Sequence, residues 1–257
     1  MPRARGAVAL TLGLIGAAAT LPARAETPET LFDRGSDAYQ AGRFEEAAEA
    51  FRAILQFRVR DPRVEYNLAN AEFKRGRVGE AILHYERARR LDPTDPDIRD
   101  NLSYARSQCA DLVEPPQLPP VVEAVVALQD SLGPDRQAWA VLVVCWALGA
   151  LLAWSLAAPG RFSAAHGWWL AALLLVLGAV AFSWYSTLMR LDGSRTAVVL
   201  APSVEVLAGP GANNATLFTV HEGLTLEVRA EREEWLHVSL PNGINGWLPR
   251  DAVGRVG

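Results

Sequence analysis

Hydrophobic residues are concentrated in two long stretches that contain no charged side chain, residues 137–158 and residues 168–189. Each stretch is long enough to cross the hydrocarbon core of a bilayer as a helix. Only nine residues, 159–167, separate them, so the pattern predicts a transmembrane hairpin. A hairpin returns the chain to the side from which it came. The polar segments before and after it are therefore expected to share a compartment, as two soluble modules on one membrane anchor.

The polar segment before the hairpin repeats itself with a constant offset of 34 residues. The positions Gly35, Tyr39, Gly42, Phe44, Ala47, Phe51 and Ile54 recur as Ala69, Phe73, Gly76, Val78, Ala81, Tyr85 and Ala88. This period is typical of antiparallel helix pairs in which small residues let helices approach and aromatic residues fill the grooves between pairs. The pattern resembles the tetratricopeptide repeat family. We expect a repeat domain at residues 28–112, with repeats at about 28–64 and 62–95 and a capping helix at 97–110.

The resemblance implies a concave protein-binding surface lined by the first helix of each pair. Its members by repeat position are Phe32, Ser36, Tyr39, Tyr66, Asn70, Phe73 and Lys74. The alternative is that the aromatic residues among them only pack within the repeats. A clamp for a peptide carboxylate is weakly indicated, because only Lys74 and Arg63 supply positive charge there.

Residues 113–136 are predicted to form a proline-rich linker followed by a short helix. Proline fixes φ and donates no hydrogen bond, so the linker is expected to be extended and to hold the repeats away from the bilayer. The following residues, 121–132, place valine and leucine between Glu123, Gln129 and Asp130. This favours a short helix at the membrane surface. Its acidic residues favour packing against a partner or the anchor over contact with lipid headgroups.

The last segment, residues 195–257, alternates apolar and polar positions, which is typical of half-buried strands. Turn sequences divide it into about five short strands, which suggests a small barrel. With its Gly209-Pro210 turn, residues 234–238 and the closing Gly246-Trp247, it resembles the bacterial SH3 family. That resemblance implies a groove for proline-containing or cell-wall peptides, drawn here from Phe218, Trp235, His237 and Trp247. The alternative is that Trp247 is a core residue and Trp235 covers an edge.

The N-terminus carries Arg3 and Arg5, an apolar run at residues 7–19 and the triplet Ala23-Arg24-Ala25. This is typical of a secretory signal peptide at residues 1–25, with an uncleaved anchor as the alternative. Export places the chain in the inner membrane of a bacterium as a two-pass protein with both soluble domains in the periplasm. The few arginines that flank the spans indicate no orientation by themselves.

Composition narrows the function classes. The formal net charge of −4 offers no basic patch for nucleic acid. His221 and His237 are too isolated for a zinc site, and no metal or other cofactor is expected. The soluble segments are too small for a large catalytic core, and Ser203, Ser239 and His237 lack a paired carboxylate in any recognisable motif. We therefore expect a protein that is not an enzyme.

The expected fold is multidomain: all-α helical repeats, a two-helix transmembrane hairpin and a small all-β SH3-like barrel. This order resembles the BatE proteins of the Bacteroides-type aerotolerance operon. The resemblance implies von Willebrand A domain membrane proteins as partners, a MoxR-type ATPase as an indirect one, and a role in envelope stress tolerance. Three hypotheses follow: a scaffold that holds such a complex together, a cell-wall-sensing receptor that binds peptidoglycan peptides, and a wall hydrolase.

Overall fold

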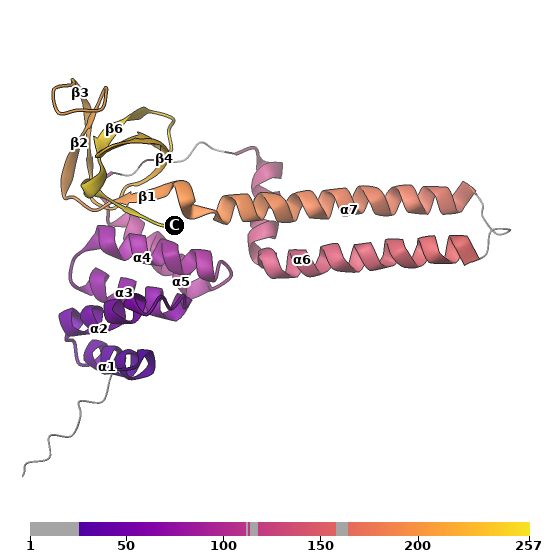
Figure 1. Cartoon of the computed structure of the whole chain (residues 1–257), viewed down its shortest axis with the longest axis horizontal. Helices are drawn as coiled ribbons and strands as arrows, with labels where there is room; N and C mark the ends of the chain where they lie inside the picture. Colours follow the sequence, from indigo (N-terminus) through magenta and orange to yellow (C-terminus); the bar gives the residue numbers. More distant parts are fainter. Residues whose placement is uncertain (1–25, 112, 114–117, 158–163) are drawn as a thin grey trace, which may run out of the picture.

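The computed structural model describes residues 26–111, 113, 118–157 and 164–257 (Figure 1). The predicted signal peptide, residues 114–117 of the linker and residues 158–163 of the hairpin turn lie outside the described residues. A helical region is followed by two long apolar helices and an antiparallel sheet. This confirms the predicted fold class.

The helical region contains two helix pairs and one further helix. The first pair is α1 (Pro28–Gln40) with α2 (Phe44–Gln56), the second is α3 (Pro62–Lys74) with α4 (Val78–Leu91), and α5 (Pro96–Ser107) follows. Asp61 and Asp95 cap α3 and α5 by accepting hydrogen bonds from backbone amides. Gly42 and Gly76 have φ of 75° and 80° at the turns within the pairs, where residues with a side chain are disfavoured.

Small residues set the distance between helices within the repeats. A Cβ atom at Gly35 would lie 2.8 Å from the ring of Phe51, and Ala81 is completely buried beside Ala69 and Tyr85. The repeated glycine and alanine positions are therefore contact points between helices.

Enlarging Ala81 to leucine is expected to destabilise the repeats by about 1–3 kcal/mol, because the close-packed site has no room for three more carbon atoms. Urea unfolding of the full chain in detergent measures the change. Ala41→Leu, at an exposed position, is the control and should leave the transition unchanged. Equal transitions for the two variants would contradict the predicted packing.

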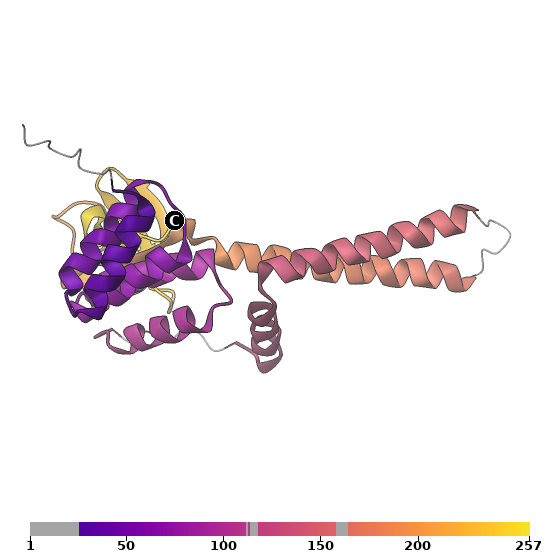
Figure 2. The ribbon, with the colours of Figure 1, turned by 90° about the horizontal axis from the view of Figure 1, so that it is seen from below.

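The two apolar helices are α6 (Pro120–Ala157) and α7 (Ala164–Leu191), and each is long and apolar enough to span a membrane. Gly133 interrupts α6 with φ of 67° and ψ of 166°, directly before Pro134. The helix therefore consists of a short segment, residues 120–132, and a long segment that packs along α7. Figures 1 and 2 show the short segment running across the direction of the hairpin.

The sheet has seven strands in the order β3-β2-β6-β5-β4-β1-β7, and all neighbours pair antiparallel. The strands are β1 (Thr196–Val199), β2 (Ser203–Leu207), β3 (Thr216–His221), β4 (Thr225–Arg232), β5 (Trp235–Ser239), β6 (Asn245–Pro249) and β7 (Val253–Arg255).

This is two more than the five or so strands expected, and one of the additional strands is β1, which shows no alternation of apolar and polar residues. Ala197 and Val199 belong to the core of the barrel, whereas Val198 belongs to a cluster with residues of the repeats. Both faces of β1 are therefore buried, and its sequence is apolar from Ala197 to Val199.

The barrel packs directly against α4, the second helix of its pair (Figure 1). Val198 and Val256 share a cluster with Ile82 and Leu83 of α4. Polar contacts surround this cluster: the Arg87 guanidinium donates to the Arg255 carbonyl at 2.6 Å, and the Gly79 amide donates to Glu222 Oε1 at 2.7 Å. The two soluble modules therefore form one unit.

The repeats also contact the base of the hairpin. That the linker holds them away from the bilayer stays a prediction. Arg90 Nε donates to the carbonyl of Leu191, the last residue of α7, at 3.1 Å. The loop after α4 approaches the kink of α6, where a Cβ atom at Gly133 would lie 2.6 Å from Thr94 Cγ2. These contacts and the shared apolar cluster keep the repeats beside the hairpin, whatever the conformation of the linker.

Candidate functional site

The shared face of α1, α3 and α5 is the first candidate site, and we call it the repeat groove. It carries the residues that repeat position assigns to binding. The barrel contacts the other helix of the second pair, α4, and the segment that follows α5. The barrel therefore leaves the repeat groove accessible.

Asn70 lies at the centre of a polar cluster in this groove. Its Oδ1 accepts hydrogen bonds from the Tyr85 hydroxyl and from Asn101 Nδ2, the latter at 3.3 Å. Asn101 also donates to the Tyr66 hydroxyl at 2.8 Å. Because the oxygen of Asn70 is engaged within the protein, its Nδ2 group is the end of the amide that can donate to a peptide carbonyl.

Burial raises the pKa of Tyr85, and the nearby Tyr66 and Tyr39 raise it further. Burial also raises the pKa of Tyr39, with a smaller contribution from Tyr66. Both phenols therefore stay protonated at neutral pH, and Tyr85 remains a hydrogen-bond donor that fixes the orientation of Asn70.

The other predicted groove residues take different places. Tyr39 packs edge-on against Phe44 with ring centroids 5.3 Å apart, and Phe73 packs against Tyr104 at 5.6 Å. Phe32 packs edge-on against Phe51. Lys74 is exposed at the end of α3. The structure thus brings Tyr66 and Asn70 together and gives the aromatic members packing contacts within the repeats.

Asn101 and Tyr104 of α5 were missed by the sequence analysis. Tyr104 is 58% exposed, which leaves most of its ring available to a ligand. Extending the 34-residue offset onto the capping helix aligns Asn101 with Asn67 and Tyr104 with Asn70. Because Asn70 is a groove position, that alignment could have identified Tyr104, whereas Asn101 is recognised only through its hydrogen bonds to Tyr66 and Asn70.

The second candidate site is an aromatic surface on β5 and β6, formed by Trp235, His237 and Trp247. We call it the barrel shelf. Their neighbours Leu236 and Leu248 point inward and are completely buried, so the three shelf residues point outward. His237 pairs directly with Trp247, and their rings lie 4.9 Å apart. Trp247 is thus half-buried on the outer face and does not belong to the buried core.

Arg232 and Phe218 change the predicted composition of the shelf. The Arg232 guanidinium lies 5.8 Å from the centroid of the Trp247 ring and adds a cation to the surface. Phe218 pairs with the buried Val206 and packs against the barrel core, so it is not part of the shelf. The sequence analysis grouped Phe218 with the other aromatic residues because the register of β3, which places Phe218 on the inner face, is not visible in the sequence.

Among the described residues, no group of three or more histidine, cysteine, aspartate or glutamate side chains is arranged to hold a metal ion. His221 lies 3.0 Å from Asp111, and His84 lies 2.7 Å from Glu65, where it links α3 to α4. These histidines therefore join structural elements.

Comparison with known families supports the type of both modules. Residues 32–96 match the tetratricopeptide repeat family, and residues 201–253 match the bacterial SH3 domain family. The chain is thus similar to tetratricopeptide proteins in its first module and to bacterial SH3 domains in its last. Both are typically non-catalytic modules that bind proteins, peptides or peptidoglycan. A search of the curated proteins found no match.

Proposed function

We propose that this protein is a non-enzymatic, membrane-anchored scaffold of the bacterial envelope, which captures a protein partner in the repeat groove. The observation that carries the proposal is the position of the barrel. It packs on α4 and leaves the face with Tyr66, Asn70 and Lys74 accessible. If the barrel filled the repeat groove, the repeats would have no such surface for a partner.

The direct contact between the modules supports a scaffold with fixed geometry. The repeat groove and the barrel shelf belong to one unit that is joined to the hairpin through Arg90 and Leu191. Two binding surfaces on one anchor raise the effective concentration of each partner for the other without new chemistry. Loss of either surface is then expected to weaken a complex that uses both.

We further propose that the scaffold lies in the inner membrane with both soluble modules in the periplasm. Two helices are long and apolar enough to span the membrane. The contact between the repeats and the barrel supports a shared compartment for the two modules. The signal sequence expected at residues 1–25 supports the periplasm as that compartment.

The order of modules, similar to that of BatE proteins, supports a place in an envelope stress complex of the aerotolerance type. Von Willebrand A domain membrane proteins are the proposed direct partners, and a MoxR-type ATPase is the proposed indirect one. The cluster of Tyr66, Asn70 and Asn101 suits a peptide or helix from such a partner, because it offers amide and hydroxyl groups for main-chain hydrogen bonds.

A cell-wall-sensing receptor is the second candidate function, and the barrel shelf favours it. Trp235, His237 and Trp247 form an outward aromatic surface beside the cation of Arg232. Such a surface can stack on apolar parts of a peptidoglycan peptide and attract its carboxylates.

In-cell crosslinking of a tagged full-length copy, followed by purification in detergent, tests the scaffold. The groove variant combines Asn70→Asp with Lys74→Ala. Aspartate keeps an acceptor for Tyr85 and Asn101 but removes the amide donor, so the repeats should stay folded. Glu49→Ala, at an exposed position of α2, is the matched control.

We expect the wild-type and control copies to recover membrane proteins with von Willebrand A domains, and the groove variant to lose them about tenfold or more. Such a loss corresponds to the removal of at least one charge-assisted hydrogen bond. Undiminished recovery by the groove variant would contradict the groove as the capture site. Recovery of wall fragments alone, lost with Trp235→Ala and Trp247→Ala, would favour wall sensing instead.

A further inference from the structure

The short segment of α6, residues 120–132, presents an exposed apolar stripe. The stripe consists of Val121, Val125, Leu128 and Leu132, whose spacing of four, three and four residues places them on one face. Val121 is 76% exposed and Leu128 is 60% exposed. Four large apolar side chains in a row are thus uncovered at the base of the hairpin.

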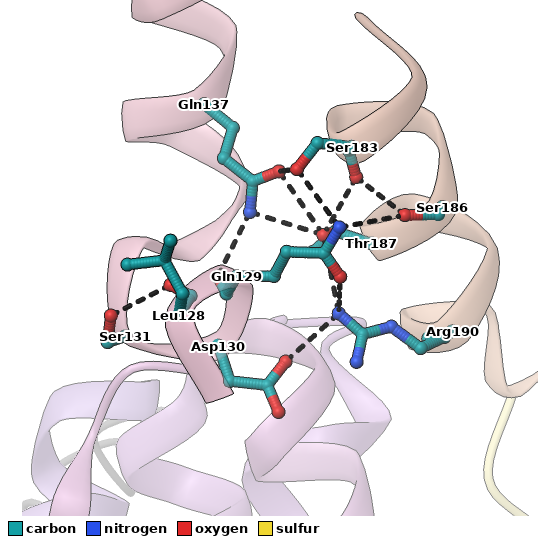
Figure 3. A network of polar contacts seen from close by, with 9 residues as sticks. All are labelled: Leu128, Gln129, Asp130, Ser131, Gln137, Ser183, Ser186, Thr187 and Arg190. Atoms are coloured by element: carbon teal, nitrogen blue, oxygen red, sulfur yellow. Dashed lines mark hydrogen bonds and ion pairs between the residues drawn. The ribbon is translucent and has the colours of Figure 1, made fainter. Parts of the chain in front are cut away.

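The acidic residues of the segment lie on the opposite face. Residues two apart on a helix point about 200° apart, so Asp130 is opposed to Leu128 and Glu123 to Val125. Asp130 lines a small cavity of about 120 Å³ together with Arg89 and Pro93 of the repeat module. Figure 3 shows Asp130 directed toward the repeat helices, whereas Leu128 points to the side on which the spans continue.

Polar side chains fix this orientation against α7 (Figure 3). Gln129 Nε2 donates to Ser183 Oγ at 3.0 Å, and the Gln129 Oε1 accepts from Arg190 at 2.8 Å. Arg190 also pairs with Asp130 at 3.2 Å. Gln137, after the kink, donates to the Gln129 carbonyl at 3.0 Å. The face of the segment that carries Gln129 is therefore held against α7, and this contact fixes the direction in which the apolar stripe points.

We propose that residues 120–132 form an in-plane membrane helix, with the apolar stripe inserted into the lipid leaflet on the side of the soluble modules. This inference rests on the membrane hairpin of the proposed function. Three observations favour lipid as the occupant: the stripe is continuous with the end of the spans, it faces the direction in which they run, and Asp130, on the opposite face, points toward the repeats. The helix thus sets the height of the repeat groove above the bilayer.

The proposal changes the interpretation of Glu123 and Asp130. In the sequence they favoured contact with protein over contact with lipid. In the structure Asp130 faces Arg190 and the repeats, so the acidic face does not oppose insertion of the other face. Exposed valine and leucine contribute apolar area that stabilises an interfacial helix when lipid covers it.

Spin labels on the full chain in vesicles of phosphatidylethanolamine and phosphatidylglycerol test the proposal. In a background with Cys109→Ser and Cys145→Ser, Val125→Cys and Leu132→Cys report on the stripe, and Glu123→Cys reports on the opposite face. A chain that keeps only Cys145, an exposed residue of the long segment of α6, reports on the hairpin itself. Collision rates with oxygen, which enters lipid, and with a water-soluble nickel chelate are measured at each label.

We expect oxygen to collide faster than nickel at Val125, Leu132 and Cys145, and the ratio to reverse at Glu123. The labels at Val125 and Leu132 could instead collide faster with nickel, as at Glu123, or be shielded from both reagents, while the label at Cys145 remains in lipid. Either result would contradict the in-plane helix and leave the membrane hairpin supported. If the label at Cys145 is also accessible to nickel, the membrane hairpin of the proposed function fails as well.

Discussion

Replacing Gly223 with alanine should separate the barrel from the repeats. Gly223 has φ of 91°, and a Cβ atom there would lie 2.3 Å from Cys109 Sγ and 3.1 Å from Ile82 Cδ1. The backbone conformation costs a residue with a side chain about 1–2 kcal/mol. Forcing a methyl group between two packed elements adds about 1–3 kcal/mol, and that part is relieved only if the modules move apart.

The reactivity of the Cys109 thiol measures this separation. In a Cys145→Ser background Cys109 is the one thiol of the chain. Burial raises its pKa, and the nearby Glu222 raises it further, so the thiol is expected to alkylate slowly while the barrel is docked. Gly223→Ala should accelerate alkylation and lower the melting temperature.

Gly243→Ala is the matched control, because Gly243 has a similar φ of 86° but no atom within 4 Å of its added Cβ. It carries the cost of the backbone conformation without the steric overlap. We expect Cys109 to be alkylated at the wild-type rate in Gly243→Ala and faster in Gly223→Ala. This difference would show that the steric overlap at the interface, and not the backbone conformation, exposes the thiol. Equal behaviour of the two variants would contradict the docked arrangement.

Replacing Arg90 with alanine should loosen the joint between the repeats, the barrel and the hairpin. Arg90 Nε donates to the Leu191 carbonyl and Arg90 Nη1 donates to the Val256 carbonyl, each at 3.1 Å. One side chain thus links α4 to the end of α7 and to the C-terminal residues of the barrel. Its half-buried bonds are worth about 1–3 kcal/mol together, after allowance for water at the surface.

Distances between spin labels at Gln40 in the repeats and Asn213 in the barrel report on this joint, because both positions are exposed. We expect a broader distance distribution for Arg90→Ala and an unchanged one for Arg89→Ala. Arg89 is the matched control, since its guanidinium bonds to Glu86 of the same helix. An unchanged distribution for Arg90→Ala would show that the apolar cluster and the other polar contacts hold the modules together without Arg90.

The sequence predicts those parts of the fold that leave a periodic pattern. The 34-residue offset indicates the helix pairs, and the charge-free stretches indicate α7 and the long part of α6. The strand β1 could not be predicted from alternation, because Val198 packs in the cluster with the repeats whereas Val199 packs in the core of the barrel. A four-residue strand buried on both faces shows no alternation.

The arrangement of the modules could not be predicted from the sequence. In the sequence Arg87 and Arg90 look like ordinary surface residues of a repeat helix. Only the fold brings the carbonyls of Arg255 and Leu191 beside them. No local pattern encodes such contacts, because their partners are about 100 or more residues away. The two candidate sites were predictable in part. In the repeat groove Tyr66 and Asn70 lie together, both bonded to Asn101, whereas Phe218, predicted for the barrel shelf, is on the inner face of the sheet because of the register of β3.

The central claim is that the repeats and the barrel share the outer side of the inner membrane on one hairpin. Single cysteines at Gln108, Asn213 and Arg161, each in a background with Cys109→Ser and Cys145→Ser, test it with a membrane-impermeant maleimide in cells whose outer membrane is permeabilised. Gln108 follows the last helix of the repeats and Asn213 lies between β2 and β3 of the barrel, and both are exposed. Arg161 lies between the spans in sequence. The account predicts labelling at Gln108 and Asn213 while the inner membrane is intact, and at Arg161 only after the inner membrane is dissolved. Labelling of Gln108 and Asn213 from opposite sides would contradict both the hairpin and the contact between the modules.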